Sequence, residues 1–492
     1  MWLPNPALES VKHGDIPLCV DLDGTLINTD SLYEGLISLL KQNFWYLFLL
    51  PLWLLRGKAD FKAQIARRVH LDVEFLPYNT ALIEFIKSQR PLRHLVLCTA
   101  ADARFAQAVS DHLGLFDELI ATTKDVNLSA ANKAKALCDR FGVGAYDYAG
   151  NDVADIAVFA RARRSLIVNP TRGLRRHLPS IDNIEQRFST PKRNHCSIGI
   201  KSIRLHQWVK NLLVFVPILA IPEAIDIGAV VTLILAFFSY SLIASSVYLV
   251  NDLLDLAADR RHPRKKNRPF AAGTLAISNG LIMASLLLLV GFSTALLISP
   301  LFFMLLLLYY TGTNLYTFWL KRVPLLDTLV LAGLYTSRIL AGAAAITVEP
   351  SFWLLAFSMF FFLSLALAKR HSELVEMVSL GGAAGLDSSI PGRGYRHEDL
   401  ATLMAQGSAS GYSAVLVFAF YINSEAARQH YNHPEVIWLI CPLLLYWINK
   451  LWLNSQRREI NDDPVIWAMT NRVSRGIAVL CALLLLLARW LP

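Results

Sequence analysis

Nine apolar stretches follow one another through residues 208–491, and they constrain the fold more than any other feature of the chain. About 20 apolar residues are enough to cross the hydrocarbon core of a bilayer as a helix. The stretches lie near residues 208–222, 228–250, 276–298, 300–319, 325–346, 351–369, 409–424, 434–453 and 475–491. Composition agrees, because 54% of the residues are hydrophobic and only 17% are charged. The sequence predicts an all-α bundle of nine transmembrane helices over residues 201–492.

Basic residues in the connections between these stretches predict the orientation of the bundle. They collect on the side that also carries the N-terminus, as Lys192, Arg193, Lys201, Arg204, Arg260 to Arg268, Lys321, Arg322, Lys369, Arg370, Arg393, Arg396, Arg457, Arg458, Arg472 and Arg475. The opposite side holds little beyond Arg428 and Arg489. By the positive-inside rule we expect a multi-pass protein of the cytoplasmic membrane, with the N-terminal part in the cytoplasm. This topology explains the net charge of +9, so we do not expect a nucleic-acid partner.

Residues 1–188 differ in composition, because short apolar runs alternate there with helix-like segments. This alternation is typical of a soluble α/β domain. Four runs predict buried strands: Pro17 to Val20, Leu95 to Cys98, Tyr146 to Ala149 and Ser165 to Val168. Residues 189–200, which contain Pro191, predict a linker between this domain and the membrane bundle.

One further apolar run, Phe44 to Leu55, interrupts the α/β domain. It has about 12 residues and contains Pro51, so it is too short to span a bilayer. Two interpretations fit it: a cap helix of the domain, or a surface that docks on the membrane.

Asp21 and Asp23 end the first predicted strand, in Cys19-Val20-Asp21-Leu22-Asp23-Gly24-Thr25-Leu26. One carboxylate can attack phosphorus while its neighbour donates a proton to the leaving oxygen. The motif resembles the haloacid dehalogenase (HAD) phosphohydrolases, which implies a HAD-like (Rossmannoid) fold. In Leu95-Val96-Leu97-Cys98-Thr99, the resemblance implies that Thr99 holds the phosphoryl group. It also implies that Lys133 neutralises charge and that Gly150 to Asp155 is an acidic metal motif.

That last motif departs from the family at one position, because Asn151 stands where the first acid is usual. The resemblance, which covers residues 14–175, then implies Mg²⁺ on Asp21 with Asp152 or Asp155. We expect phosphatase activity, and a HAD fold that serves only as a scaffold or sensor is the alternative.

A second acidic motif follows directly on the second apolar stretch, where Asn251, Asp252, Asp255 and Asp259 leave the membrane. Like charges at this spacing repel one another along a helix. Mg²⁺ would relieve the repulsion, since it favours a few carboxylates completed by substrate phosphates. Six basic residues suited to phosphate come next: Arg260, Arg261, Arg264, Lys265, Lys266 and Arg268. The sequence therefore predicts a metal-diphosphate site at the mouth of a membrane cavity.

The segments at residues 204–211, 251–259 and 267–270 resemble the UbiA superfamily of membrane prenyltransferases. The resemblance covers roughly residues 200–490 and implies a nine-helix bundle whose cytoplasmic loops hold Mg²⁺ and a diphosphate. The second aspartate motif of the ordinary members is missing, since residues 314–327 offer only Tyr316, Lys321 and a lone Asp327. Without this second motif, the chain resembles the branch that transfers phosphoribose from phosphoribosyl diphosphate (PRPP) to a polyprenyl phosphate.

Roles for individual residues follow from that reading. Mg²⁺ on Asp252 and Asp255, with Asn251 and Asp259, would hold the diphosphate, and Lys210 would bind the lipid phosphate. Further candidate substrate-binding residues are Arg264, Lys265, Arg268, Tyr316, Lys321, Asp327, Arg338, Lys369 and Arg370. Arg338 lies inside a span, where an ionisable group is costly. We do not expect it to pair with Asp327, because eleven residues of helix separate them by ~16 Å. Lys369 and Arg370 fit a sugar-phosphate site and a simple membrane anchor equally well.

These patterns predict a bifunctional membrane enzyme. Its bundle would make a polyprenyl-phosphoryl phosphoribose, and its HAD-like domain would remove the 5-phosphate. Two alternatives stay open: an aromatic prenyltransferase with an isoprenyl diphosphate donor, and a lipid transporter or receptor with a HAD sensor domain.

Overall fold

A computed structural model describes residues 16–124, 126–188, 195–220, 226–381, 393–460 and 463–490. Residues 189–194 of the expected linker lie outside the described residues, and residues 195–200 belong to helix α9 (His195–Ser202). The chain forms two compact units. The first comprises residues 1–203 and 248–283, and the second comprises residues 204–247 and 284–492.

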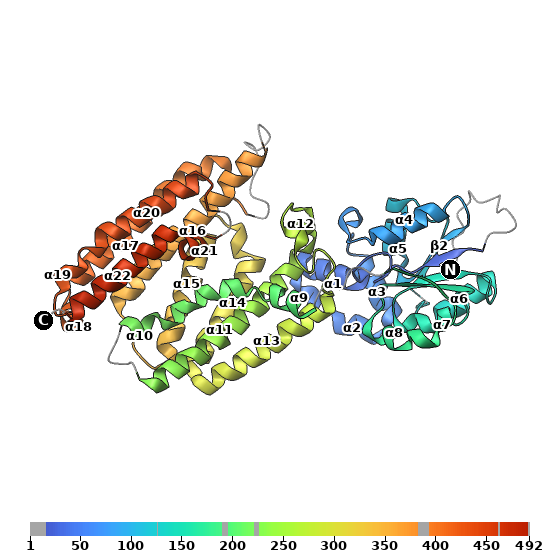
Figure 1. Ribbon diagram of the computed structural model, residues 1–492, viewed down its shortest axis with the longest axis horizontal. Helices are drawn as coiled ribbons and strands as arrows, with labels where there is room; N and C mark the ends of the chain where they lie inside the picture. Colours follow the sequence, from blue (N-terminus) through green and yellow to red (C-terminus); the bar gives the residue numbers. More distant parts are fainter. Residues whose placement is uncertain are drawn as a thin grey trace. The chain divides into compact units, whose positions relative to one another are not determined.

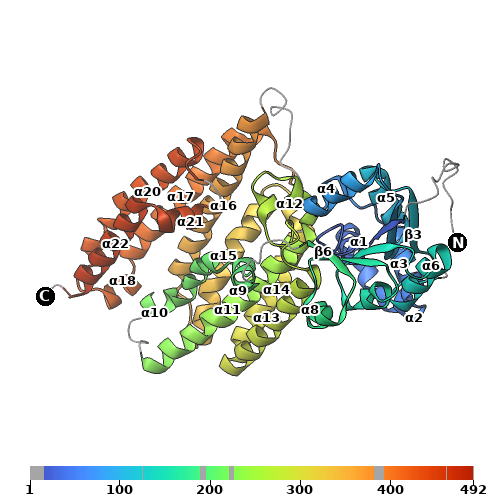
Figure 2. The same cartoon turned by 45° about the vertical axis from the view of Figure 1, so that its right-hand side comes forward.

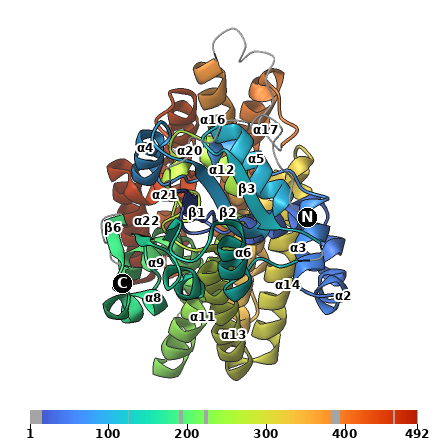
Figure 3. The ribbon, with the colours of Figure 1, turned by 90° about the vertical axis from the view of Figure 1, so that its right-hand side faces the viewer.

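The first unit is built on a six-stranded parallel sheet in the order β3-β2-β1-β4-β5-β6. The strands are β1 (Leu18–Val20), β2 (Leu95–Asp102), β3 (Glu118–Thr122), β4 (Asp147–Gly150), β5 (Arg164–Val168) and β6 (Ile184–Phe188). The four predicted strands are confirmed as β1, β2, β4 and β5. Figure 3 shows β1, β2 and β3 side by side. The sequence analysis missed β3 and β6, which are the two edge strands; β3 has only a short apolar run and β6 has none.

Helices cover both faces of this sheet (Figure 1). The helices of this unit up to residue 188 are α1 (Ser31–Gln42), α2 (Leu50–Leu55), α3 (Lys58–Ala66), α4 (Thr80–Gln89), α5 (Ala103–Leu113), α6 (Ala131–Phe141), α7 (Ile156–Phe159) and α8 (Arg172–His177). Successive strand residues point to opposite faces. Leu95 and Leu97 therefore pack with α4 and α5, whereas Val96 and Cys98 pack with α6 and α7.

The second unit is a bundle of long apolar helices. Its α15 contacts α14 and α16, and its α17 contacts α16 and α20 (Figure 2). The helices after α9 are α10 (Val216–Ala220), α11 (Ile227–Leu254), α12 (Leu256–Arg261), α13 (Ile277–Ile298), α14 (Pro300–Phe318), α15 (Leu326–Ala345), α16 (Phe352–Gly381), α17 (Leu400–Ile422), α18 (Glu425–His430), α19 (Pro434–Ile437), α20 (Ile440–Gln456), α21 (Pro464–Thr470) and α22 (Arg472–Trp490).

Eight helical segments of the described residues are long and apolar enough to cross a membrane, against the nine expected. They are Ile227–Leu254, Ile277–Ile298, Pro300–Phe318, Leu326–Ala345, Phe352–Val378, His397–Ile422, Pro434–Gln456 and Arg472–Trp490. The expected first span near 208–222 is instead a 3-10 helix (Leu205–Phe215) followed by the short α10. Pro217 removes a backbone donor there. Lys210 and Asn211 are buried in the 3-10 helix, so this segment places polar groups inside the bundle.

Candidate active sites

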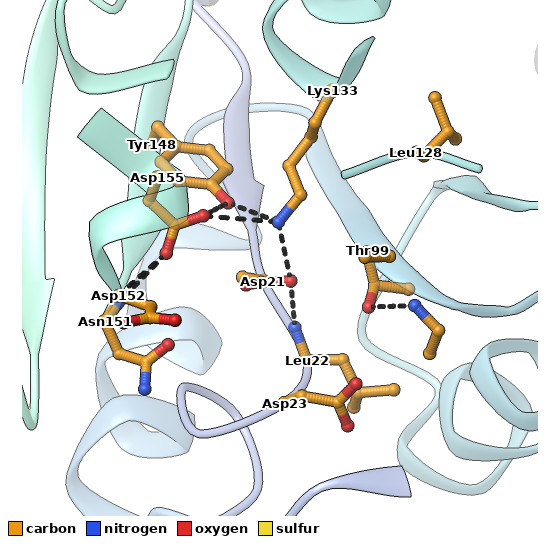
Figure 4. A network of polar contacts seen from close by, with 12 residues as sticks. Asp21, Leu22, Asp23, Thr99, Leu128, Lys133, Tyr148, Asn151, Asp152 and Asp155 are labelled. Atoms are coloured by element: carbon orange, nitrogen blue, oxygen red, sulfur yellow. Dashed lines mark hydrogen bonds and ion pairs between the residues drawn. The ribbon is translucent and has the colours of Figure 1, made fainter. Parts of the chain in front are cut away.

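Acidic residues gather where three neighbouring strands of the sheet end. Asp21 and Asp23 follow β1, Thr99 lies in β2, and Asn151 to Asp155 follow β4. Because β1 lies between β2 and β4, these side chains come together at the carboxyl edge of the sheet (Figure 4). That edge is where open α/β sheets place their ligands.

Lys133 projects from α6 into this group and joins its two acids (Figure 4). Its Nζ lies 3.0 Å from Asp21 Oδ1 and 3.3 Å from Asp155 Oδ1, and it donates to the Tyr148 hydroxyl at 2.9 Å. Burial alone would lower the pKa of Lys133, but the carboxylates of Asp21 and Asp155 raise this pKa by more, so the net shift is upward. The lysine therefore stays charged beside Asp21.

The two aspartates of the first motif have different protonation equilibria. Burial raises the pKa of Asp21 to about 6, although Lys133 opposes the shift. Burial and the charge of Asp30 raise the pKa of Asp23 to about 8. Asp23 also accepts hydrogen bonds from the backbone N–H of Ser31 at 2.8 Å and from its hydroxyl at 3.2 Å. Near neutral pH one carboxylate is ionised and the other is protonated, which is how a nucleophile and an acid are separated.

The acidic motif after β4 provides both a positioning group and polar ligands. Asp155 is buried; its Oδ2 accepts the backbone N–H groups of Asn151 and Asp152 at 3.0 Å, and its Oδ1 faces Lys133. Asp152 is exposed and accepts from the Thr171 hydroxyl at 2.9 Å. The Asn151 amide lies against the turn at Gly24, where an added Cβ would be 2.2 Å from Asn151 Nδ2. Asn151 thus faces the loop that carries Asp21, whereas the oxygens of Asp155 already have partners.

A cavity of about 520 Å³ opens over these residues. Its lining includes Lys62 of α3, whose Nζ donates to the Ala100 carbonyl at 2.7 Å. Burial lowers the pKa of Lys62. Thr99 is fully buried and accepts from the backbone N–H of Ala101 at 3.0 Å. Lys62 was missed by the sequence analysis, because a lysine in an unassigned helical insertion carries no motif.

The wall of the same cavity includes a segment from far along the chain. Gly273, Ala276, Ile277 and Ser278 line it together with Asp21 and Asp23. At Gly273 the backbone has a φ of +66°, and an added Cβ would lie 2.5 Å from the Asn28 carbonyl oxygen. Only glycine fits this contact without strain. The connection between α11 and α13 is therefore part of the wall of the cavity over Asp21.

That connection also carries the second acidic motif. The helix is interrupted at Asp255, between α11 and α12, but the backbone N–H groups of Asp255 and Asp259 still donate to the carbonyls four residues earlier. Arg268 Nη1 lies 3.0 Å from Asp252 Oδ1 and 2.7 Å from Asp259 Oδ2. Asp255 Oδ1 lies 3.4 Å from Lys41 Nζ.

The carboxylates of Asp252 and Asp259 fit a cation, because both already face one guanidinium nitrogen. No group of three or more His, Cys, Asp or Glu in the described part of the chain is arranged to hold a metal by itself. A divalent ion here would therefore need oxygen ligands from its substrate, which is the usual situation for Mg²⁺. Asn251 lies in the last turn of α11, while Arg264 and Lys265 are exposed in the turn before Arg268.

In the second unit, several predicted substrate-binding residues form one buried network. Arg370 is fully buried; its Nε lies 2.5 Å from Asp327 Oδ2, its Nη2 donates to the Tyr316 hydroxyl at 2.6 Å, and its Nη1 lies 2.7 Å from Glu373 Oε2. Asp327 also accepts from the Tyr395 hydroxyl. Asp327 is thus neutralised by Arg370. Lys321 lies in the turn after α14 (Leu320–Arg322).

Lys210 and Lys369 meet at a carboxylate that the sequence analysis missed. Their Nζ atoms lie 2.6 and 3.1 Å from Asp463 Oδ2. Although burial opposes it, the two lysines hold the pKa of Asp463 well below its usual value. Two cations share one anion, so the cluster keeps a positive charge suited to a phosphate. Asp463 stands in a polar connection with no recognisable spacing, so only the fold identifies it.

As the sequence analysis expected, Arg338 and Asp327 do not form a pair. Arg338 Nε donates to Asn211 Oδ1 at 2.9 Å, and its guanidinium lies 5.1 to 5.4 Å from the rings of Tyr240, Tyr309 and Tyr335. The charge is held inside the bundle by an amide and aromatic faces.

Comparisons with known proteins agree with the membrane part of this architecture. The model of the UbiA prenyltransferase family matches residues 212–470. A relative from Sinorhizobium fredii, named uncharacterized protein y4nM, is 34% identical over 471 residues, 95% of this chain and 90% of the relative. Decaprenyl-phosphate phosphoribosyltransferase of Mycobacterium tuberculosis is 34% identical over 194 residues, 39% of this chain and 64% of that protein.

Two solved structures resemble the two parts of the fold. A UbiA homologue from Archaeoglobus fulgidus bound to GPP and Mg²⁺ has a TM-score of 0.44 at 15% identity and covers 59% of this chain and 97% of that one. A HAD family hydrolase from Salmonella enterica has a TM-score of 0.26 at 15% identity and covers 35% of this chain and 66% of that one.

Proposed function

Because the chain belongs to the UbiA prenyltransferase family, we propose that its membrane part is a transferase that moves 5-phosphoribose from PRPP to a polyprenyl phosphate. The choice of PRPP as the donor rests on the ion pair that Asp327 forms with Arg370. The region where ordinary members have a second aspartate motif offers this one acid, and Arg370 neutralises it inside the bundle. A second metal site for a prenyl diphosphate therefore has no free carboxylate there. The similarity to decaprenyl-phosphate phosphoribosyltransferases supports the same choice.

In the transfer step, the bond between the ribose anomeric carbon and the diphosphate oxygen breaks, and the diphosphate leaves with the electron pair. A lipid phosphate oxygen then forms the new bond to that carbon. Asp252 and Asp259, with Asn251 and Asp255 nearby, would hold Mg²⁺, which supplies positive charge to the leaving diphosphate. Arg268, released from these carboxylates, is placed to bind the same diphosphate, and Arg264 and Lys265 add charge beside it.

The acceptor site that we propose is the cluster around Asp463. Lys210 and Lys369 carry two positive charges against one carboxylate, so a lipid phosphate can replace or share the contacts of Asp463. Arg338 and Asn211 lie in the same bundle and provide further donors.

The HAD-like domain would remove the 5-phosphate of the product. Asp21 attacks phosphorus and forms an aspartyl phosphate, while the bond to the sugar oxygen breaks and Asp23 gives that oxygen its proton. Asp23, now a base, takes a proton from the water that releases phosphate from Asp21. Lys133, oriented by Asp155 and Tyr148, neutralises the charge beside Asp21. The hydroxyl of Thr99 would help to hold the phosphoryl group. Asp21 and Asn151, with Asp152, would hold Mg²⁺, which adds positive charge beside the phosphoryl oxygens.

The family also includes enzymes with prenyl diphosphate donors, so the donor must be tested directly. Membranes that contain the chain should be given labelled PRPP with decaprenyl phosphate, or a labelled isoprenyl diphosphate with an aromatic acid. Lipid-soluble label from PRPP alone supports the proposal. Product from the prenyl diphosphate alone would establish the aromatic prenyltransferase. If neither pair reacts and the biological activity survives Asp252→Ala and Asp255→Ala, the transporter or receptor view would replace both.

A further inference from the structure

The segment Phe44–Leu55 exposes a concentrated apolar surface on the α/β domain. Eight of its large apolar side chains are exposed: Phe44, Trp45, Leu47, Phe48, Leu49, Leu52, Leu54 and Leu55. Only five other large apolar side chains are exposed in the described residues of the range 16–188. A contiguous exposed surface of this kind marks an interaction site.

The segment is held firmly from its inner side. It consists of a 3-10 helix (Phe44–Phe48) followed by α2, and it lies between α1 and α3. Trp53 is buried with Leu39 and Ile65, and its ring centre lies 5.9 Å from that of Tyr46. Because Trp53 fixes the segment to the domain, the outward direction of its other side chains is built into the fold.

The charged residues that directly flank this segment in the sequence are basic. Residues 42–57 contain no acid, and the exposed cations Lys41, Arg56 and Lys58 flank the segment. An apolar face with an exposed tryptophan and a basic rim is the pattern of segments that lie in the interface of an anionic bilayer. A surface that pairs with a second copy of the chain would not need this basic rim.

The position of the segment agrees with a bilayer as its partner. Lys41, at the end of α1, lies 3.4 Å from Asp255. Asp255 directly follows Leu254, the last residue of the membrane-spanning helix α11. The end of α1 therefore lies close to the end of the candidate membrane span α11, and the apolar segment begins three residues later.

We propose that Phe44–Leu55 docks the α/β domain on the bilayer, with its apolar side chains among the lipid chains and Arg56 and Lys58 at anionic head groups. The proposal does not depend on the function assigned above. It deepens that function in one respect: a docked domain would hold the cavity over Asp21 near the surface at which a lipid-linked sugar phosphate resides.

Photocrosslinking in the full chain tests this docking. p-Benzoylphenylalanine would replace Leu52 or Leu55 in protein reconstituted into nanodiscs of phosphatidylcholine and phosphatidylglycerol. Trypsin cleaves after Lys41 and Arg56, so a lipid adduct would appear on the peptide of residues 42–56. Val143, which is 75% exposed, is the matched control on the same domain. We expect a phospholipid adduct at Leu52 and Leu55 and none at Val143.

Two results would overturn the proposal: a crosslink to a second copy of the chain, or lipid adducts no more frequent at Leu52 than at Val143. The charged rim has its own test in the double variant Arg56→Glu with Lys58→Glu. It should lower the adduct yield at Leu52, read in this variant on the tryptic peptide of residues 42–62, by about tenfold or more. An unchanged yield would refute the role of the basic rim. Thermal unfolding of the photocrosslinking variant at Leu52, with and without the two charge substitutions, would show that the domain is still folded.

Discussion

Arg260 and Glu34 form a buried ion pair across 226 positions of sequence, with guanidinium nitrogens 3.0 and 2.5 Å from the two carboxylate oxygens. Glu34 lies in α1, one turn after Ser31, and Ser31 holds the acid Asp23. Arg260 lies in α12, beside Asp259 of the second acidic motif. One helix of the α/β domain is thereby fixed to the connection that carries the proposed diphosphate site.

Breaking this pair should destabilise the first unit. Glu34→Gln leaves the buried charge of Arg260 without its carboxylate, which costs about 3 kcal/mol. We expect a lower thermal midpoint of the detergent-solubilised protein. The double variant Glu34→Leu with Arg260→Met should lose less stability than the sum of the losses in Glu34→Leu and in Arg260→Met. Arg261→Gln is the matched control, because its pair with Asp72 is largely exposed and contributes little. Equal effects of Glu34→Gln and Arg261→Gln would contradict the role of the buried pair.

Asn151→Asp should increase the affinity of the phosphatase site for Mg²⁺. The substitution adds a carboxylate beside the loop of Asp21, and the number of charged ligands sets the affinity for a hard cation. We expect the Mg²⁺ concentration for half-maximal phosphate release to fall about tenfold, which corresponds to ~1.4 kcal/mol. The Mg²⁺ dependence of the transfer step serves as the internal control and should not change. The assignment fails if the two steps shift together, or if neither shifts.

Arg268→Gln should separate metal binding from donor binding. Arg268 now competes with a cation for Asp252 and Asp259, so its removal should reduce the Mg²⁺ concentration needed for transfer. The same variant loses a charged contact with the diphosphate, and the KM for PRPP should rise about tenfold. Arg268→Lys should restore part of the donor affinity. A variant with unchanged KM for PRPP would show that Arg268 does not bind the donor.

Asp463→Asn should destabilise the bundle and free two lysines for the acceptor phosphate. Lys210 and Lys369 would keep their charges without the shared carboxylate, at a cost of about 3 kcal/mol. We expect a lower thermal midpoint together with a lower KM for polyprenyl phosphate, because the phosphate no longer competes with a carboxylate, and Asp463→Glu should stay close to the natural protein. Saturating polyprenyl phosphate should restore part of the lost stability, because a bound phosphate replaces the missing charge. Destabilisation without any change in acceptor KM would leave Asp463 a purely structural role.

Local patterns in the sequence were sufficient for much of the fold. The four central strands, the carboxylates at the end of β1 and most membrane spans follow from runs of apolar residues and their polar ends. The edge strands β3 and β6 could not be predicted, because they are half-exposed and have few consecutive apolar residues. The 3-10 helix at Leu205–Phe215 could not be predicted either, because its apolar residues are typical of a regular membrane span. Long-range pairs were also beyond reach. Asp463 with Lys210, Arg260 with Glu34, and Arg370 with Asp327 depend on packing between distant segments, which spacing along the chain does not encode.

The most direct test of the account is the lipid product made from PRPP and decaprenyl phosphate by the purified full chain. Mass spectrometry should find decaprenyl-phosphoryl ribose with the natural protein, and the 5-phosphorylated form with Asp21→Asn. Asp252→Ala should give neither product. A chain that leaves decaprenyl phosphate unchanged, while the reconstituted protein is folded and supplied with Mg²⁺, would contradict the central claim.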